Sequence, residues 1–168
     1  MLTQAIITAA GTGLLLILAV MTLRARFVIV TVDGDSMAPL LRPGDQLVVR
    51  RRGLDRIRAG DIVVLEPPDS RGGAGRSESV GLRGRHWVIK RAAALPGEPV
   101  PEGLTYAPDV PREAIVPAGR LFVLGDNPIN SIDSRAYGSV PGRDVLGVVI
   151  HVRAFRRERS NAASRTRP

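Results

Sequence analysis

The feature that most constrains this chain is a stretch of 19 residues without a charged side chain, from Ala5 to Leu23. At about 1.5 Å per residue, a helix of this length covers a hydrocarbon core of about 30 Å. A cleaved secretory signal would start with a basic residue and end in a small-x-small site, and neither is present. We therefore expect an uncleaved membrane-spanning helix over about residues 5–23, inside an anchor segment 1–26.

The sequence that follows predicts β structure. Short runs rich in β-branched residues alternate with Gly, Pro and Asp, which is typical of antiparallel strands joined by turns. No long stretch after residue 27 has a helical period. The expected strands cover residues 27–32, 46–50, 62–65, 87–89, 121–124 and 145–152.

Composition excludes several kinds of site. The chain has no cysteine, which rules out disulfides and thiolate chemistry, and His86 and His151 are too few for a histidine-built metal site. The net charge is +8, but six arginines against one glutamate in residues 153–168 supply +5 of it. We expect this tail to be disordered, the Gly-, Ser- and Arg-rich loop at about 69–85 to be flexible, and no nucleic acid to bind.

Among the 24 basic residues, only Lys90 is a lysine. An ammonium can lose its proton when buried, whereas a guanidinium effectively never does. Lys90 ends an apolar run, where burial would lower the pKa of the amine. Chance survival of one lysine is the alternative at this point.

Two other stretches carry polar residues that turn chemistry explains only in part. Residues 33–45 form a turn after a strand, which could present the Ser36 hydroxyl and its own amide to a carbonyl; alternatively, Ser36 only satisfies the turn. Residues 124–141 follow an apolar strand and bring together Ser131, Asp133 and Arg135.

In this order and behind a membrane helix, the three stretches resemble the type I signal peptidases. The matching segments are Gly34-Asp35-Ser36-Met37-x-Pro39, Ile89-Lys90-Arg91 with Leu95-Pro96-Gly97-Glu98, and Gly125-Asp126-Asn127 followed by Ser131-x-Asp133-Ser134-Arg135. The resemblance covers most of residues 1–150. It implies a compact antiparallel β-sheet pseudo-barrel over residues 27–152, without a cofactor or metal.

The resemblance also implies a role for each site residue. Ser36 would be the nucleophile, with its backbone amide as an oxyanion donor, and neutral Lys90 the general base. Ser131 would orient Lys90, while Asp133 and Arg135 would form a structural pair near the site. Arg91 can stay charged beside Lys90, so we expect it to point away from the site.

Three positions depart from the family pattern. Gly34 replaces a serine that assists the oxyanion in some relatives, Leu40 replaces a threonine, and Pro128 replaces a basic residue. About 34 residues separate Lys90 from Gly125, which leaves no space for a large extra β-domain. We expect a compact family member.

By resemblance, the substrates are preproteins or propeptides with small residues at the first and third positions before the cut. The lipid bilayer is the second expected partner, because only 13 residues, at most about 43 Å, connect Leu23 to Ser36. Arg24 and Arg26 alone would place the domain in the cytoplasm. The family topology places it on the extracytoplasmic face, and we follow the family.

Other functions stay open at this point. The chain could be a maturation protease dedicated to one peptide or protein rather than a general signal peptidase. A non-catalytic membrane-anchored binding module would keep the strands without the chemistry. Self-cleaving repressors share Ser-Lys chemistry, but they carry a DNA-binding segment where this chain has its apolar run.

Overall fold

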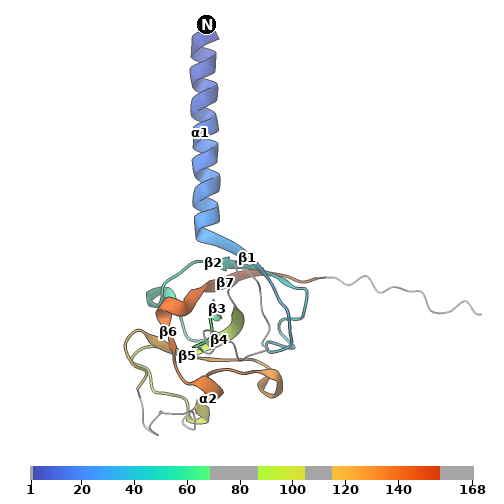
Figure 1. Ribbon diagram of the computed structural model, residues 1–168, viewed down its shortest axis with the longest axis vertical. Helices are drawn as coiled ribbons and strands as arrows, with labels where there is room; N and C mark the ends of the chain where they lie inside the picture. The colour runs from blue at the N-terminus through green and yellow to red at the C-terminus, as the bar shows by residue number, and fades with distance from the viewer. Residues whose placement is uncertain (1, 69–86, 105–114, 156–168) are drawn as a thin grey trace, which may run out of the picture.

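One long helix leads directly into a single antiparallel sheet (Figure 1). The computed structural model describes residues 2–68, 87–104 and 115–155. Helix α1 covers Leu2–Arg26, and four-residue α2 covers Ser134–Tyr137. The strands are β1 Phe27–Thr31, β2 Gln46–Arg50, β3 Ile62–Leu65, β4 Val88–Ala94, β5 Arg120–Leu124, β6 Val140–Pro141 and β7 Val145–Arg153.

The seven strands form a half-barrel in the order β1-β2-β7-β3-β4-β5-β6. Every pair is antiparallel. The last long strand, β7, lies between β2 and β3 and so joins the N-terminal hairpin to the rest of the sheet. The site residues on β4 therefore lie inside the sheet, where both neighbouring strands fix them.

Three register shifts bend the sheet. They fall between Val48 and Val49, between Val64 and Leu65, and between Ala92 and Ala94. An extra residue on one strand raises the local twist and curves the ladder. The curvature wraps the strands around the buried side chains instead of leaving a flat sheet.

The buried apolar side chains form three clusters. The first joins β1 and β2 to the turn that carries Ser36, and includes Met37 and Leu41. The second lies among β3, β4, β5 and β7. The third packs Phe122 of β5 against Val100, Leu104 and Val116. Because the first cluster includes part of the Ser36 turn, that turn is anchored in the core.

The strand predictions are confirmed, with two differences. Strand β4 continues past Ile89 to Ala94, because Ala92 and Ala94 are buried against the core and extend the pairing with β5. The two-residue strand β6 was missed, since it is too short to show alternation. The expected loop at 69–85 and most of the basic tail lie outside the described residues.

The N-terminal helix is longer than expected and runs without a break to Arg26. Within the described part of the chain, no helix has the length and apolar character that crossing a membrane demands. The spanning anchor is thus not confirmed. The division into anchor, peptidase domain and tail also stays a prediction.

Gly147 of β7 marks a close approach between strands. A Cβ added there would overlap the carbonyl oxygen of Arg50 and would lie 2.9 Å from the Cα of Arg51. We predict that Gly147→Ala lowers the free energy of unfolding by about 1–3 kcal/mol, because backbone must move to admit the methyl group. Urea denaturation measures the loss.

The matched control is Gly13→Ala, where an added Cβ meets nothing within 4 Å. Equal stability of Gly147→Ala and the parent would contradict this account of the β2–β7 contact.

Candidate active site

Ser36 lies in a closed turn that follows β1. Backbone hydrogen bonds from Val32 to Asp45 (2.8 Å) and from Gly44 to Val32 (2.9 Å) join the two ends of the turn. Gly34 has a φ of 126°, a conformation that other residues rarely adopt. Ser36 itself is 3% exposed. The turn therefore holds the serine at a defined place beneath the surface.

Lys90 is completely buried in the middle of β4. It pairs with Val63 of β3, and its strand neighbours Val88 and Ala92 belong to the second apolar cluster. Its Nζ donates a 3.0 Å hydrogen bond to Ser131 Oγ. Burial disfavours the charged form of an amine. The structure thus gives the single lysine an apolar strand environment and a polar contact at its tip.

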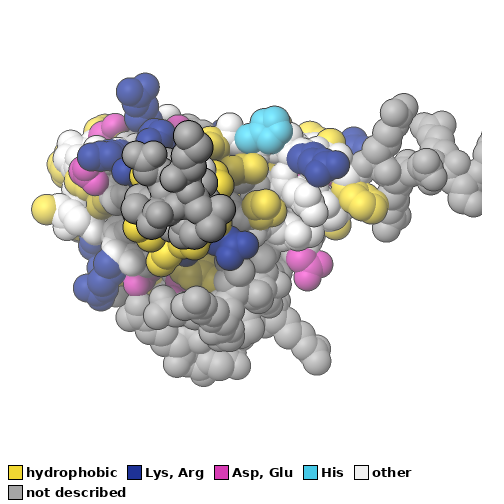
Figure 2. Space-filling model, turned by 90° about the horizontal axis from the view of Figure 1, so that it is seen from above, with side chains coloured by type: hydrophobic (Ala, Val, Ile, Leu, Met, Phe, Trp, Pro, Cys, Tyr) yellow, Lys and Arg dark blue, Asp and Glu magenta, His cyan; other side chains and the backbone are white. Residues whose placement is uncertain are grey.

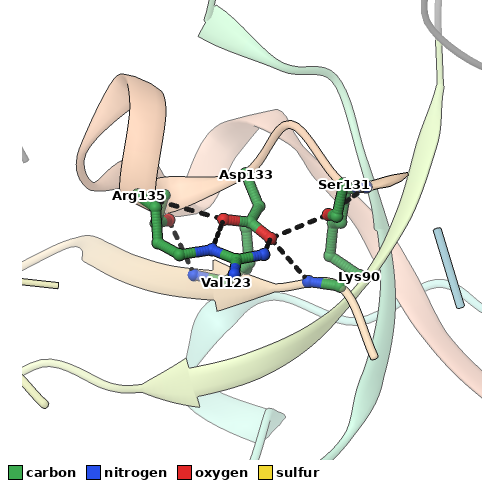
Figure 3. Close-up of polar contacts among 7 residues, drawn as sticks. Lys90, Val123, Ser131, Asp133 and Arg135 are labelled. Atoms are coloured by element: carbon green, nitrogen blue, oxygen red, sulfur yellow. Dashed lines mark hydrogen bonds and ion pairs between the residues drawn. The ribbon is translucent and has the colours of Figure 1, made fainter. Parts of the chain in front are cut away.

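Ser131 contacts Asp133 as well as Lys90, as Figure 3 shows. Its hydroxyl donates to Asp133 Oδ2 at 2.7 Å. Arg135 approaches the same carboxylate from the other side, with Nε at 2.9 Å from Oδ1 and Nη2 at 2.7 Å from Oδ2. Lys90, Ser131, Asp133 and Arg135 therefore form one connected group.

Asp133 is held ionised inside this group. Its burial alone would raise the pKa, but hydrogen bonds from the Arg135 side chain, the Gly125 amide, the Ser131 hydroxyl and the Arg135 amide outweigh burial and lower the pKa to about 2. The bond from the Arg135 amide also caps α2. A charged acceptor fixes the direction in which Ser131 donates, so the Ser131 oxygen presents its lone pairs to Lys90.

Gly125 connects this group to the turn that carries Ser36. A Cβ added there would lie 2.5 Å from Ser131 Cβ and 2.7 Å from the carbonyl oxygen of Ser36. Those distances are shorter than real Cβ contacts, so only glycine fits. The main chain of Ser36 and the side chain that contacts Lys90 therefore lie against the same residue.

Arg91, the next residue of β4, pairs with Asp126 of the loop after β5. Its expected direction, away from the site, stays a prediction. Arg91 donates to both carboxylate oxygens of Asp126, at 2.8 and 2.6 Å, and to the carbonyl of Gly60 at 2.8 Å. Consecutive residues of β4 thus hold the loop after β5 at two points, Lys90 through Ser131 and Arg91 through Asp126.

Asn127, which was not among the predicted site residues, contacts the turn that carries Ser36 directly. Its amide donates to the carbonyl of Ser36 at 2.9 Å, and its side-chain Nδ2 donates to the carbonyl of Asp35 at 3.1 Å. Gly, Asp and Asn are also typical turn residues, so local sequence gives Asn127 no other role. The available signal was its position only a few residues before Ser131.

A cavity of about 820 Å³ opens beside the turn that carries Ser36. Residues on both sides of Ser36 line it, together with the two residues that follow β7, Ala154 and Phe155. Its lining is mostly apolar, and consists of Asp35, Ala38, Pro39, Leu40, Arg42, Pro43, Asp45, Ala154 and Phe155. The described residues include no group of three His, Cys, Asp or Glu side chains that could hold a metal ion.

Comparison with known proteins agrees with this arrangement. The family model described as "Signal peptidase, peptidase S26" matches residues 4–102 and 101–153. The chain belongs to this family. The resemblance seen in the motifs is therefore confirmed, whereas the roles of the individual site residues stay predictions.

Relatives of known description support the same family. "Probable signal peptidase I-1" of Synechocystis sp. is 32% identical over 155 residues, which cover 80% of this chain and 76% of the relative. "Signal peptidase I V" of Bacillus subtilis is 27% identical over 165 residues, 79% of this chain and 89% of the relative. "Mitochondrial inner membrane protease subunit 1" of Xenopus tropicalis is 32% identical over 115 residues, 67% and 60% respectively.

The lowered pKa of Asp133 predicts a specific pH dependence. The carboxylate favours folding while it is ionised, so its contribution is complete above about pH 4 and is lost as the pH falls toward 2. We expect this contribution to be about 2 kcal/mol. Urea denaturation of the parent and of Asp133→Asn from pH 2 to 7 measures it.

In Asp133→Asn, the fall in stability between pH 4 and 2 should shrink by that amount. Asp55→Asn is the control, since Asp55 is exposed and pairs only loosely with Arg56 at 3.5 Å. Identical pH profiles for the parent and Asp133→Asn would contradict the assignment.

Proposed function

We propose that this chain is a membrane-attached serine endopeptidase that removes signal peptides from exported preproteins with a Ser36-Lys90 dyad. The observation that carries the proposal is the complete burial of Lys90, with its Nζ on Ser131 and the Ser36 turn packed against the same loop. Membership of the signal peptidase family supports the reaction class.

The reaction begins with neutral Lys90. Its lone pair accepts the proton of Ser36 as Oγ attacks the scissile carbonyl, and a bond forms between Oγ and the carbonyl carbon. The tetrahedral oxyanion accepts a hydrogen bond from the Ser36 amide. As the C–N bond breaks, the lysine ammonium returns its proton to the leaving amine.

Water completes the cycle. Lys90 accepts a proton from water as the oxygen attacks the acyl-enzyme, and returns it to Ser36 Oγ when the ester bond breaks. Ser131 accepts a hydrogen bond from Nζ in the resting enzyme, with Asp133 and Arg135 fixing Ser131 from behind. The amine stays at one place while its protonation state changes.

The substrate is an extended segment of a preprotein with small residues at the first and third positions before the cut. Such a segment binds mainly through main-chain hydrogen bonds to strand edges. Ser36 lies just past β1, which is an edge strand of the described sheet. The strand edge and the nucleophile are therefore close together in the chain.

Membrane attachment through residues 5–23 is part of the same proposal. Arg24 and Arg26 lie in the last turn of α1, and hydrophobic side chains are exposed on β1 (Ile29) and β7 (Ile150 and Val152). Figure 2 shows arginine side chains and hydrophobic side chains together on the face from which the helix rises. This composition suits the interface between lipid headgroups and water.

The dyad is tested with the full chain in detergent and a preprotein that has a small-x-small site. We expect Ser36→Ala, Lys90→Arg and Lys90→Met each to lower kcat/KM by about 10³-fold or more. Arginine keeps its charge and cannot act as the base, and methionine fills the same volume without a proton acceptor. Gel analysis of cleavage over time measures the rates.

Circular dichroism and thermal denaturation control for folding. Lys90→Met should be at least as stable as the parent, since it buries an apolar side chain in an apolar strand. Near-parental cleavage by Lys90→Arg or by Ser36→Ala would contradict the proposed dyad.

The proposed topology places the catalytic domain on the extracytoplasmic face. A C-terminal tag on the chain in spheroplasts should be removed by an added protease, while a cytoplasmic marker protein stays intact. A tag that is protected until the membrane is dissolved would place the domain in the cytoplasm.

A further inference from the structure

Asn127 holds the peptide groups on both sides of the nucleophile. Its backbone amide donates to the carbonyl of Ser36 at 2.9 Å, and its side-chain Nδ2 donates to the carbonyl of Asp35 at 3.1 Å. These are successive carbonyls of the chain. One residue therefore restricts the rotation of the two peptide planes that meet at the Cα of Ser36.

The Asp35 carbonyl shares its peptide plane with the amide of Ser36. The described residues have a single cis peptide bond, between Ala38 and Pro39, so the Asp35–Ser36 bond is trans. In a trans peptide, C=O and N–H point in opposite directions. A hydrogen bond that fixes the direction of the Asp35 carbonyl thereby fixes the direction of the Ser36 N–H.

We propose that the Asn127 side chain is a positioning residue that aims the Ser36 amide at the oxyanion of the tetrahedral intermediate. This inference rests on the proposed function, because it assigns a task within that reaction. The backbone bond from Asn127 holds the Ser36 carbonyl in any variant, whereas the bond to Asp35 depends on the side chain. The two contacts can be separated by mutation.

The two residues before Asn127 are themselves held in place. Asp126 forms a two-point ion pair with Arg91 on β4, and Gly125 packs against Ser131 and the carbonyl of Ser36. Arg91 follows Lys90 directly on the strand. A single stretch of β4 therefore sets both the position of the general base and, through Asp126 and Asn127, the direction of the oxyanion donor.

The residue two positions before Ser36 offers no side-chain donor for the oxyanion. Gly34 occupies that position and has no hydroxyl to donate. The Ser36 amide then carries a larger share of the oxyanion stabilisation. A donor that points away from the oxyanion loses most of its effect, since hydrogen bonds weaken steeply with misalignment.

The test compares Asn127→Ala with Asn130→Ala in the full chain. Asn130 belongs to the same loop and is exposed, with its backbone amide on the Asn127 carbonyl at 3.2 Å. We expect Asn127→Ala to lower kcat by about 10- to 100-fold with KM close to the parent, since a whole oxyanion donor is worth about 10²- to 10³-fold. Asn130→Ala should match the parent.

A peptide aldehyde with alanine at the first and third positions gives the decisive readout. Ser36 Oγ adds to the aldehyde carbon, and the carbonyl oxygen becomes the hemiacetal oxygen at the oxyanion position, with the serine proton transferred to it through Lys90. Asn127→Ala should weaken binding of the aldehyde by the same factor by which it lowers kcat/KM. The same peptide ending in a primary amide should bind as it binds to the parent.

A second variant, Asn127→Asp, keeps the shape and the backbone bond but faces the Asp35 carbonyl with an acceptor. It should lose at least as much aldehyde affinity as Asn127→Ala. Unchanged kcat in Asn127→Ala, or an equal loss for the aldehyde and the amide, would overturn the inference. A parent enzyme that cleaves no preprotein, or a Ser36→Ala variant that does, would instead overturn the proposed function.

Discussion

The arrangement of the site depends on one buried amine and the acceptor at its tip. Removing the lysine amine from water costs free energy unless the amine is hydrogen-bonded. The 3.0 Å contact between Nζ and Ser131 Oγ offsets part of that cost. Ser131 can accept a hydrogen bond from Lys90 because its own hydroxyl donates to Asp133. The carboxylate is in turn kept ionised by Arg135 and by the amide of Gly125. Each side chain therefore orients the next one, in the order Arg135, Asp133, Ser131 and Lys90.

The sheet gives that series a stable base. Lys90 lies opposite Val63 in one of the two inner pairs of the β3–β4 ladder, and its chain neighbour Arg91 pairs with Leu124 of β5. Because side chains alternate along a strand, two adjacent residues of β4 reach the same loop from different sides. The loop after β5 is therefore held at two points, and the turn that carries Ser36 lies against it through Gly125 and Asn127.

Much of this was predictable from the sequence for physical reasons. Strands such as β2 and β3 are short β-branched runs between turn residues, so local pattern was enough to find them. The single lysine among arginines pointed to the site because only an amine can be neutral. Ser36, Ser131, Asp133 and Arg135 were found through family motifs, and the structure brings the last three together with Lys90.

Other features depend on contacts between segments that are distant in the chain, so local sequence pattern could not predict them. Strand β6 has two residues, and its pairing with β5 arises from the tertiary fold. The continuation of β4 through three alanines depends on what covers them. Asn127 resembled an ordinary turn residue, because its contacts with Asp35 and Ser36 join segments that lie about 90 residues apart.

The junction between α1 and β1 has a mechanical consequence. The helix ends at Arg26, the strand starts at Phe27, and the carbonyl of Arg26 accepts a hydrogen bond from the amide of Arg51, the residue after β2. There is no slack linker to absorb a change of angle. The helix acts as a lever arm on the sheet, so any tilt of its axis is transmitted to the strand that ends five residues before the serine.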